Sequence, residues 1–371
     1  MHHDAISRSA QQREIIDLGL VPVLTHLNTS ALAVLAGTNI FITGGTGFFG
    51  LWLLSALDHL NRQGARIRAT VLSRDPARFL QSQPYWATRD WLAFHRGNVR
   101  DFAFPQERYD LLIHAATDTS VAAQANPMEI FADIVDGTRH VLDFAVQSGI
   151  KRTLLTSSGA VYGPQPADIS HITEDARFAC APESAASAYG EAKRAMELLG
   201  TLYHAKYGLE SVIARCFAFA GPGLPLDGHF AIGNFINDAL YADAIMVKGD
   251  GTPLRSYLYG ADLSVWLLTL LAIGKPAYPY NVGSDQAVSI AGLADTVRDV
   301  VAPEKTCNIS ARPVQGAARQ QYLPAIERCR NELGLDVWTP LKRAIELAAA
   351  YCRIEQRNAL PVATMNQPGW K

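Results

Sequence analysis

The sequence has few of the features that mark a secreted, metal-bound or nucleic-acid-binding protein. Its five cysteines are an odd number, widely spaced and without a C-x-x-C pair, which indicates neither a disulfide framework nor a zinc site. Such cysteine usage favours a reducing cytoplasm. The formal net charge of -2 leaves no basic field for a nucleic-acid backbone. We therefore expect a cytoplasmic protein without a metal site or a nucleic-acid partner.

Long apolar runs are missing as well. The amino terminus lacks the basic-then-apolar order of a secretory signal. The apolar stretch 20–37 is broken by Pro22, His26 and Asn28, and the run 265–274 is about half of the ~20 residues that a membrane span needs. We expect no membrane partner, and we interpret residues 1–37 as a helical extension that packs on the domain or on a partner subunit.

Strand-like and helix-like patterns alternate along the rest of the 371 residues, of which 49% are hydrophobic. Such a chain is large enough for a main domain and a smaller one. The alternation predicts an α/β fold, a Rossmann-type doubly wound parallel sheet with a smaller α/β substrate-binding lobe. The expected strands are 39–43, 67–72, 111–115, 152–157, 211–217 and 279–283.

The rhythm changes near residue 219, where Pro- and Gly-rich loops begin. We therefore assign the dinucleotide-binding domain to residues 38–218 and 256–284. The substrate-binding lobe is expected to comprise residues 219–255 and 285–371.

The first expected strand ends in GGTGFFG, residues 44–50. A direct turn from a strand into a helix needs glycine where a side chain would be crowded out, and the first N–H groups of the helix then face outward. In the G-x-x-G-x-x-G spacing, Gly44 permits the turn, Gly47 lets the backbone approach a pyrophosphate, and Gly50 lets the helix press on the strand. The cofactor-binding turn is thus predicted to comprise Gly44, Thr46, Gly47, Phe48, Phe49 and Gly50.

Several motifs in order make the chain resemble the extended short-chain dehydrogenase/reductase family of nucleotide-sugar epimerases, dehydratases and reductases. The resemblance covers about residues 38–350. It rests on TGGTGFFG (43–50), HAAT (114–117), GTRHVL (137–142), TSSGAVYG (156–163), YGEAK (189–193), GDGTPLRSYLYGADL (249–263) and NVGS (281–284).

Tyr189 and Lys193 are the candidate chemical groups. Four residues apart on a helix, they project from one face, so the ammonium is expected to lower the pKa of the phenol. Ser158 closes the fourth apolar strand, where its hydroxyl could bind the same substrate oxygen. The resemblance implies that Ser158 orients the reacting oxygen, that Tyr189 exchanges its proton and that Lys193 also holds the nicotinamide ribose. Ser157 is the alternative serine.

The two residues after this serine bear on the reaction. The resemblance implies an Asp and a Glu there in sugar-nucleotide 4,6-dehydratases, and a Glu in related decarboxylases. Here they are Gly159 and Ala160, which cannot move a proton. Dehydration and decarboxylation are therefore disfavoured.

Cofactor choice depends on the end of the second strand, where Ser73 and Arg74 stand in place of the usual acid. Hydroxyl and guanidinium donors suit a 2'-phosphate, which favours NADP(H). Asp75 could instead accept ribose hydroxyls, so NAD(H) is the alternative. The resemblance also implies cofactor contacts from Asn98, Val99, Ala115, Ala116 and Thr117.

Substrate candidates lie mainly in the carboxyl-terminal half. The resemblance implies that Arg255, in the GDG-x-x-x-R motif, pairs with a nucleotide-sugar diphosphate, a task that suits a guanidinium fork. Ala218 stands where the family usually has Asn, and His229 and Asn234 are the candidate replacements. Thr119 is expected to line the site, as are Ser158 and Tyr189. A homodimer through a four-helix contact is also implied.

These interpretations converge on an NADP(H)-dependent oxidoreductase that reduces the 4-keto group of an NDP-4-keto-6-deoxyhexose. The leading alternative is an NAD-dependent nucleotide-sugar 4-epimerase. A 4,6-dehydratase and a non-catalytic dinucleotide sensor are the remaining hypotheses.

Overall fold

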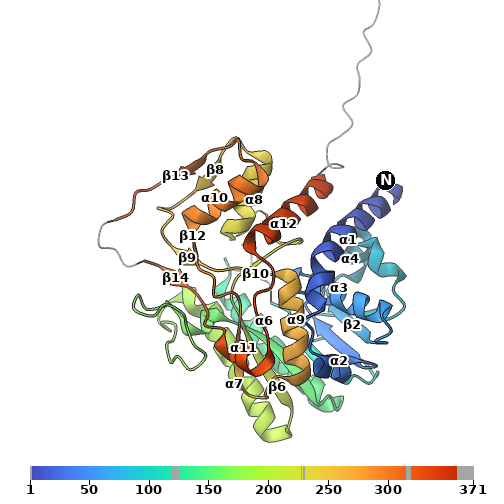
Figure 1. Cartoon of the computed structure of the whole chain (residues 1–371). Helices are drawn as coiled ribbons and strands as arrows, with labels where there is room; N and C mark the ends of the chain where they lie inside the picture. Colours follow the sequence, from blue (N-terminus) through green and yellow to red (C-terminus); the bar gives the residue numbers. More distant parts are fainter. Residues whose placement is uncertain (1, 118–124, 227, 229, 315–318, 357–371) are drawn as a thin grey trace, which may run out of the picture.

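The computed structural model describes residues 2–117, 125–226, 228, 230–314 and 319–356 (Figure 1). Seven parallel strands form its central sheet in the order β11-β6-β5-β4-β1-β2-β3. The strands are β1 (Asn39–Thr43), β2 (Arg68–Ser73), β3 (Leu92–Arg96), β4 (Leu111–His114), β5 (Arg152–Ser158), β6 (Glu210–Cys216) and β11 (Pro279–Val282). The predicted doubly wound parallel sheet is confirmed.

Six of these strands match the expected ones because they are buried on both faces and therefore form nearly continuous apolar runs. The β1 strand, for example, has the burial pattern of a central strand and pairs with β2 and β4. The sequence analysis missed β3. Its sequence LAFHR lies at the sheet edge and is only partly buried, so it lacks a continuous apolar run.

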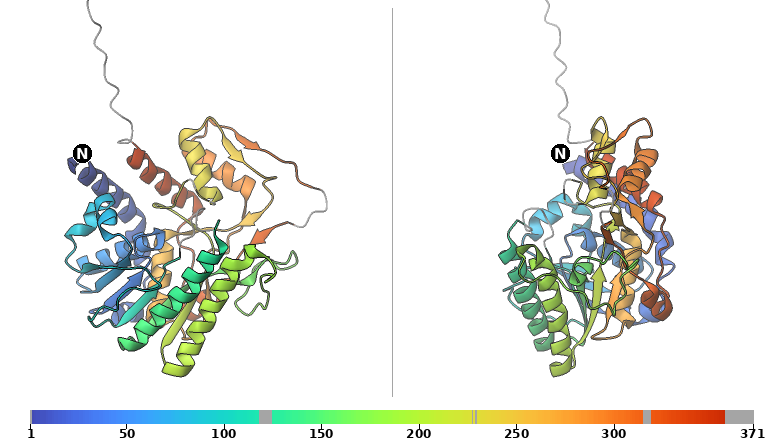
Figure 2. Two further views of the ribbon diagram at one scale, coloured as in Figure 1. Left: turned by 180° about the vertical axis from the view of Figure 1, so that it is seen from behind. Right: turned by 90° about the vertical axis from the view of Figure 1, so that its left-hand side faces the viewer.

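Helices cover both faces of the sheet, as the second view of Figure 2 shows. On one face α6 (Pro127–Gln147) packs along α7 (Ala188–Tyr207). On the other face lie α3 (Phe48–Arg62) and α9 (Gly260–Ile273). Residues 260–272 of α9 are all buried, as expected for a helix that is apolar all round.

The predicted amino-terminal extension contains α1 (His2–Leu24) and α2 (Thr29–Leu35). In Figure 1, α1 lies beside α12 (Leu341–Gln356), and it also contacts α3 and α9. Leu20 and Leu35 are fully buried in the same core cluster as the sheet. Within the described part of the chain no single helix is long and apolar enough to cross a bilayer, and α1 and α2 meet the test only as a pair bent by 119°.

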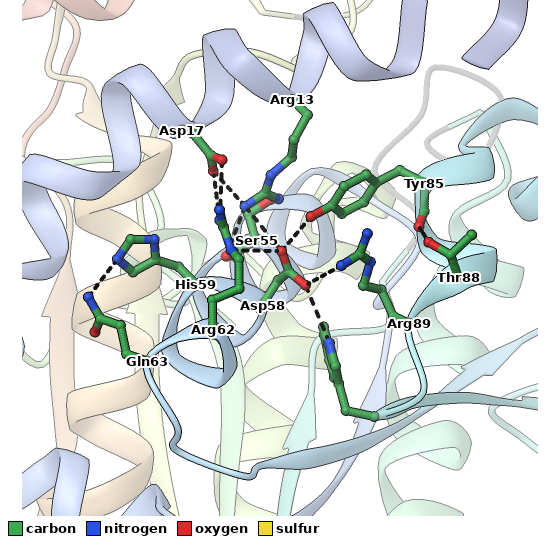
Figure 3. Close-up of polar contacts among 11 residues, drawn as sticks. Arg13, Asp17, Ser55, Asp58, His59, Arg62, Gln63, Tyr85, Thr88 and Arg89 are labelled. Carbon is green, nitrogen blue, oxygen red and sulfur yellow. Dashed lines mark hydrogen bonds and ion pairs between the residues drawn. The ribbon is translucent and has the colours of Figure 1, made fainter. Parts of the chain in front are cut away.

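A buried carboxylate fastens α1 and the segment 84–91 to α3 (Figure 3). The side chain of Asp58 is only 1% exposed and accepts hydrogen bonds from Tyr85 Oη at 2.5 Å and Trp91 Nε1 at 3.3 Å. From α1, the Arg13 guanidinium reaches Ser55 Oγ at 2.7 Å and Asp58 at 3.8 Å. The extension is thus tied to α3 by charge as well as by apolar packing.

The smaller lobe is built from segments of the carboxyl-terminal half of the chain. Its helices α8 (Ala231–Tyr241) and α10 (Ile290–Val301) pack together and against α12. Its short strands form three small sheets made of β7 (Phe219–Ala220), β8 (Ile245–Val247), β9 (Leu254–Arg255), β10 (Leu258–Tyr259), β12 (Val288–Ser289), β13 (Cys307–Ile309) and β14 (Gln321–Tyr322). Helix α11 (Glu327–Leu333), within the range predicted for the lobe, lies against β11 of the central sheet.

Candidate active site

The glycine-rich turn after β1 leaves the amino end of α3 open. Gly44 has φ +73°, and a Cβ on it would lie 2.3 Å from the carbonyl oxygen of Ala115. A Cβ on Gly50 would lie 2.1 Å from backbone atoms of Gly45. At Gly47, by contrast, a Cβ would meet only the Gly44 oxygen at 3.6 Å, and no side chain caps α3. This open helix end fits the pyrophosphate of a dinucleotide.

The aromatic residues of the turn contribute packing rather than polar groups. Phe48 and Phe49 are half-buried, and Phe49 meets Phe219 of β7 edge-on with ring centroids 5.1 Å apart. Thr46 is exposed beside them. The two phenylalanines can therefore offer a phosphate only their backbone N–H groups, whereas Thr46 also carries a hydroxyl.

The other predicted cofactor residues follow the neighbouring strands at the same edge of the sheet. The N–H groups of Ala115 and Ala116 donate to Thr43 Oγ1 at 3.1 and 3.2 Å, which fixes the chain after β4. Asn98 accepts from the Arg100 N–H at 3.1 Å. Further along the chain, Val99 packs at Gly137 of α6, where a Cβ would lie 2.8 Å from Cγ1 of Val99. Parallel sheets of this kind bind ligands at the carboxyl ends of their strands.

The end of β2 carries hydroxyl and guanidinium groups. Ser73 Oγ accepts from the Asp75 N–H at 3.3 Å, and Asp75 Oδ1 caps α4 (Pro76–Ser82) through the Arg78 N–H at 3.0 Å. Arg74 is exposed. Arg96, which the sequence analysis missed, pairs in register with Ser73 from β3 and is exposed too. Recognition of β3 would have revealed it.

Ser158, Tyr189 and Lys193 meet at the carboxyl end of β5. Ser158 is 7% exposed, and its hydroxyl accepts from the Ala160 N–H at 3.1 Å. Tyr189, in the first turn of α7, is half-buried. One turn later, Lys193 is 2% exposed and donates to Thr117 Oγ1 at 2.8 Å and to the Thr156 oxygen at 2.7 Å. Its Nζ lies 6.0 Å from the centroid of the Tyr189 ring.

The expected electrostatic effect of Lys193 on Tyr189 is wrong for this structure. Burial raises the pKa of Tyr189 to about 12, and the factor that lowers it is a hydrogen-bonding interaction with Ser158 rather than the lysine. Burial also lowers the pKa of Lys193 to about 8, against raising contributions from Cys216 and Glu197. Burial is thus the largest influence on the pKa of each residue, and the Tyr189 phenol is protonated at neutral pH.

Adjacent Ser157 belongs to a different polar cluster. Its hydroxyl donates to Glu197 Oε1 at 2.6 Å, and Glu197 forms an ion pair with Arg215 at 2.7 Å. Consecutive residues of a strand point to opposite faces, so Ser157 and Ser158 cannot serve the same oxygen. The geometry therefore favours Ser158 over Ser157 as the serine beside Tyr189.

His114, at the end of β4, is a packed core residue. It is fully buried, with Nδ1 2.8 Å from Thr43 Oγ1 and Nε2 3.1 Å from Thr138 Oγ1. Burial, followed by the charge of Lys193, lowers its pKa to about 3. His114 is thus a neutral link between β1 and α6.

Two of the substrate candidates, Arg255 and Asn234, lie in the lobe. Half-buried Arg255 donates to the Leu254 oxygen at 2.8 Å and makes no ion pair with any residue that the structure describes. Asn234 lies half-buried on α8. Thr119 and His229 lie outside the described residues. Tyr322, which the sequence analysis missed because no local pattern marks it, places its hydroxyl beside Gly159.

The chain is similar to known proteins over most of its length. The model of the NAD dependent epimerase/dehydratase family matches residues 40–283. UDP-glucuronic acid decarboxylase 6 of Arabidopsis thaliana is 29% identical over 83% of this chain and 87% of that protein. UDP-glucuronic acid decarboxylase 1 of Danio rerio is 26% identical over 84% of this chain and 72% of that protein.

Solved structures share the fold. UDP-glucose 4-epimerase of Thermotoga maritima has a TM-score of 0.72 at 21% identity, with 85% of this chain and 98% of that one covered. A dTDP-glucose 4,6-dehydratase of Streptomyces venezuelae with NAD bound has a TM-score of 0.72 at 23% identity, with 86% and 98% covered.

Proposed function

The chain belongs to the NAD dependent epimerase/dehydratase family, and from this premise we propose that it is an NADP(H)-dependent nucleotide-sugar reductase. The proposed substrate is an NDP-4-keto-6-deoxyhexose, whose 4-keto group is reduced to a hydroxyl. The observation that carries the proposal is that Ser158 and Tyr189 lie together at the end of β5, while Gly159 and Ala160, which follow Ser158, bear no proton-transferring side chain.

The proton chemistry suits reduction. With a pKa near 12, Tyr189 holds its proton at neutral pH and can donate it to the oxygen of a carbonyl that accepts hydride. Ser158 can donate a hydrogen bond to the same oxygen and stabilise its developing negative charge. Lys193, which donates to Thr117 and Thr156, is proposed to hold the ribose of the cofactor as well.

The two residues after Ser158 bear on whether this chain is a decarboxylase. Removal of a carboxyl group or of water needs a second acid or base near the sugar ring. Gly159 and Ala160 offer none. A decarboxylase or a 4,6-dehydratase is therefore disfavoured, although the relatives named above are decarboxylases.

The residues at the carboxyl edge fit an NADP(H) cofactor. The open amino end of α3 at Gly47 suits its pyrophosphate, and Ser73, Arg74 and Arg96 supply donors for a 2'-phosphate. One carboxylate oxygen of Asp75 is engaged in capping α4, which weakens its candidacy for ribose hydroxyls. When bound, the reduced nicotinamide would supply the hydride.

Substrate binding is assigned to the lobe. The Arg255 guanidinium is proposed to pair with the diphosphate, since it has no competing carboxylate among the described residues. Asn234, His229 and Thr119 remain candidates for contacts to the nucleotide sugar. Ser158 and Tyr189 would meet the sugar at the reacting carbon.

The test is to mix the purified protein with NADPH and an NDP-4-keto-6-deoxyhexose. We expect loss of the reduced-nicotinamide absorbance together with a 4-hydroxy sugar product. The Tyr189→Phe variant should bind NADPH normally but lose turnover by about 100-fold or more, because it lacks the proton donor.

The same protein should also be given UDP-glucose and UDP-glucuronic acid. Interconversion of hydroxyl epimers without added cofactor, with NAD released on denaturation, would identify the chain as a 4-epimerase instead. Release of carbon dioxide would identify a decarboxylase. Binding of dinucleotide with no turnover of any sugar would indicate a sensor.

We also propose a homodimer through α6 and α7. Met128 and Phe131 on α6 and Leu198 and Leu202 on α7 are large exposed apolar side chains, with Met128 83% and Leu198 58% exposed. Their three- and four-residue spacing places each pair on one helix face. A double change of Leu198→Glu and Leu202→Glu should convert the dimer to a monomer in light scattering.

A further inference from the structure

Gly190 follows Tyr189 directly in the first turn of α7 and is buried. Its φ is not positive, so its backbone conformation does not require glycine. Inside a helix glycine is less favourable than alanine, because it loses more conformational freedom on folding. The reason for a glycine at this position is therefore found in its neighbours.

Two neighbours occupy the space where a side chain at position 190 would lie. A Cβ on Gly190 would be 2.5 Å from Cys180 Sγ and 2.8 Å from the carbonyl oxygen of Ala160. Ala160 belongs to η2 (Gly159–Tyr162), the short 3-10 helix that follows β5. The Cys180 thiol donates to the same Ala160 oxygen at 3.1 Å. Because a backbone oxygen cannot swing aside as the end of a flexible side chain can, α7 lies this close to η2 only without a side chain at position 190.

Ala160 also holds the serine of the site. Its N–H donates to Ser158 Oγ at 3.1 Å, and Ser158 is the residue that caps η2. Ala160 therefore contacts Ser158 through its N–H and the helix that carries Tyr189 through its carbonyl oxygen. The two candidate catalytic side chains are thus connected through the backbone of a single residue.

Arg194 ties the same three segments together one turn further along α7. Its Nη1 donates to the Val161 oxygen of η2 at 3.2 Å and to the Phe178 oxygen at 3.3 Å. The side chain is 43% exposed and also pairs with Glu191 at 3.5 Å. The guanidinium thus fastens η2 and the segment 178–180 to the helix that carries the tyrosine.

We propose that Gly190 is a positioning residue. Its missing side chain lets α7 close onto the Ala160 oxygen. This contact sets the distance between the Ser158 and Tyr189 hydroxyls, and Arg194 fastens it. Both hydroxyls are assigned to one substrate oxygen, so a shift of either by about 1 Å misplaces the proton donor. The inference rests on the proposed function for the identity of the reaction.

The first test is Gly190→Ala. The new methyl group would lie 2.8 Å from the Ala160 oxygen, so α7 and η2 must separate. We expect kcat to fall by about 100-fold, the cost of a misplacement of about 1 Å. The KM for the nucleotide sugar should change by less than about two-fold, because Arg255, which is proposed to hold the diphosphate, lies in the lobe.

The matched control is Gly200→Ala, further along the same helix. A Cβ there would lie 2.7 Å from Cδ1 of Leu155, so this change also crowds a buried contact of α7, but away from η2. It should lower the midpoint of urea denaturation and leave kcat within about two-fold of the native value. A loss of kcat in Gly190→Ala alone therefore reports on position and not on stability.

A second variant leaves the glycine intact. Arg194→Met keeps most of the aliphatic stem and removes both hydrogen bonds to the carbonyl oxygens of Val161 and Phe178. We expect kcat to fall by about five-fold, the equivalent of one hydrogen bond of ordinary strength. The control is Arg343→Met, because Arg343 is 42% exposed and pairs with Glu346, three residues along its helix. This control should leave kcat unchanged.

Failure of the inference is separable from failure of the proposed function. Should the native protein epimerise sugars rather than reduce them, the same variants are compared on epimerisation, where the two hydroxyls again act on one sugar oxygen. The inference is overturned when Gly190→Ala or Arg194→Met keeps the native kcat, or when Gly200→Ala loses as much as Gly190→Ala.

Crystal structures of the native protein and of Gly190→Ala test the inference without any substrate. The distance between Ser158 Oγ and Tyr189 Oη should be longer in the variant by about 0.5 Å or more, which is the tolerance of a catalytic arrangement. An unchanged distance overturns the inference, whatever reaction the native protein catalyses.

Discussion

The adjacent residues Ser157 and Ser158 offer a sharp test of the site, because both carry the same hydroxyl group but interact with different side chains. Ser158→Ala removes the hydroxyl that interacts with Tyr189, while Ser157→Ala removes the one that donates to Glu197 at 2.6 Å. Both changes delete a single oxygen from β5. Any difference between them therefore reports on position.

The expected magnitudes follow from these contacts. Loss of one donor to the developing oxyanion lowers kcat by about 100-fold or more, which is the prediction for Ser158→Ala. A hydrogen bond to a charged group contributes about 1.5–3 kcal/mol to stability. Glu197 keeps its ion pair with Arg215, so the free energy of unfolding of Ser157→Ala should fall by about 1.5 kcal/mol, the lower end of that range.

Two measurements separate the variants. Initial rates of NADPH oxidation give kcat, and urea denaturation followed by circular dichroism gives the apparent free energy of unfolding. Dinucleotide affinity, measured by fluorescence titration, should be unchanged in both. The reasoning is refuted if Ser157→Ala loses turnover while Ser158→Ala retains it, since the serine beside Tyr189 would then be the wrong one.

Three further outcomes are expected. Asp58→Asn should lower the free energy of unfolding by about 1.5–3 kcal/mol in urea denaturation, because the hydrogen bonds from Tyr85 and Trp91 lose their charged acceptor while Arg13 keeps Asp17 as an ion-pair partner; an unchanged midpoint would contradict this. Burial holds the pKa of His114 near 3, below its ordinary 6.5, so the unfolded chain takes up the proton at a higher pH than the folded one. Between about pH 7 and about pH 4, the free energy of unfolding of the native protein should therefore fall by about 3 kcal/mol more than that of the His114→Asn variant. Arg96→Ala should weaken NADPH about ten-fold and NADH hardly at all; equal weakening of both would remove the 2'-phosphate role.

The sequence predicted those parts of the site that depend on local spacing. Gly44 and Gly50 were predicted from the turn after β1, and the structure leaves no room for a side chain at either position. The spacing of Tyr189 and Lys193 predicted one helix face, and α7 places both toward the end of β5. In each case a short segment with one backbone geometry fixes the relation, so no tertiary information was needed.

The parts that sequence reasoning missed depend on contacts between distant segments. Arg96 reaches the end of β2 only because β3 pairs with it, and β3 is an edge strand without an apolar run. Tyr322 reaches Gly159 because β14 pairs with β9 in the lobe. Neither residue has a local pattern that would single it out.

The expectation that Lys193 lowers the pKa of Tyr189 was wrong for a different reason. The two residues were identified correctly, but burial, and not the charge of the lysine, has the largest effect on the pKa of the phenol. Spacing along a helix places a cation near a phenol, but it does not state how deeply both are buried. Here burial raises the pKa of Tyr189 and lowers that of Lys193, so each neutral form is favoured more than in water. A phenol that holds its proton is the form that a reduction needs, whereas an oxidation would first have to remove that proton. The depth of the site, which the sequence does not reveal, thus sets the protonation state of both side chains before a substrate binds, while the direction of the reaction depends on which form of the cofactor is supplied.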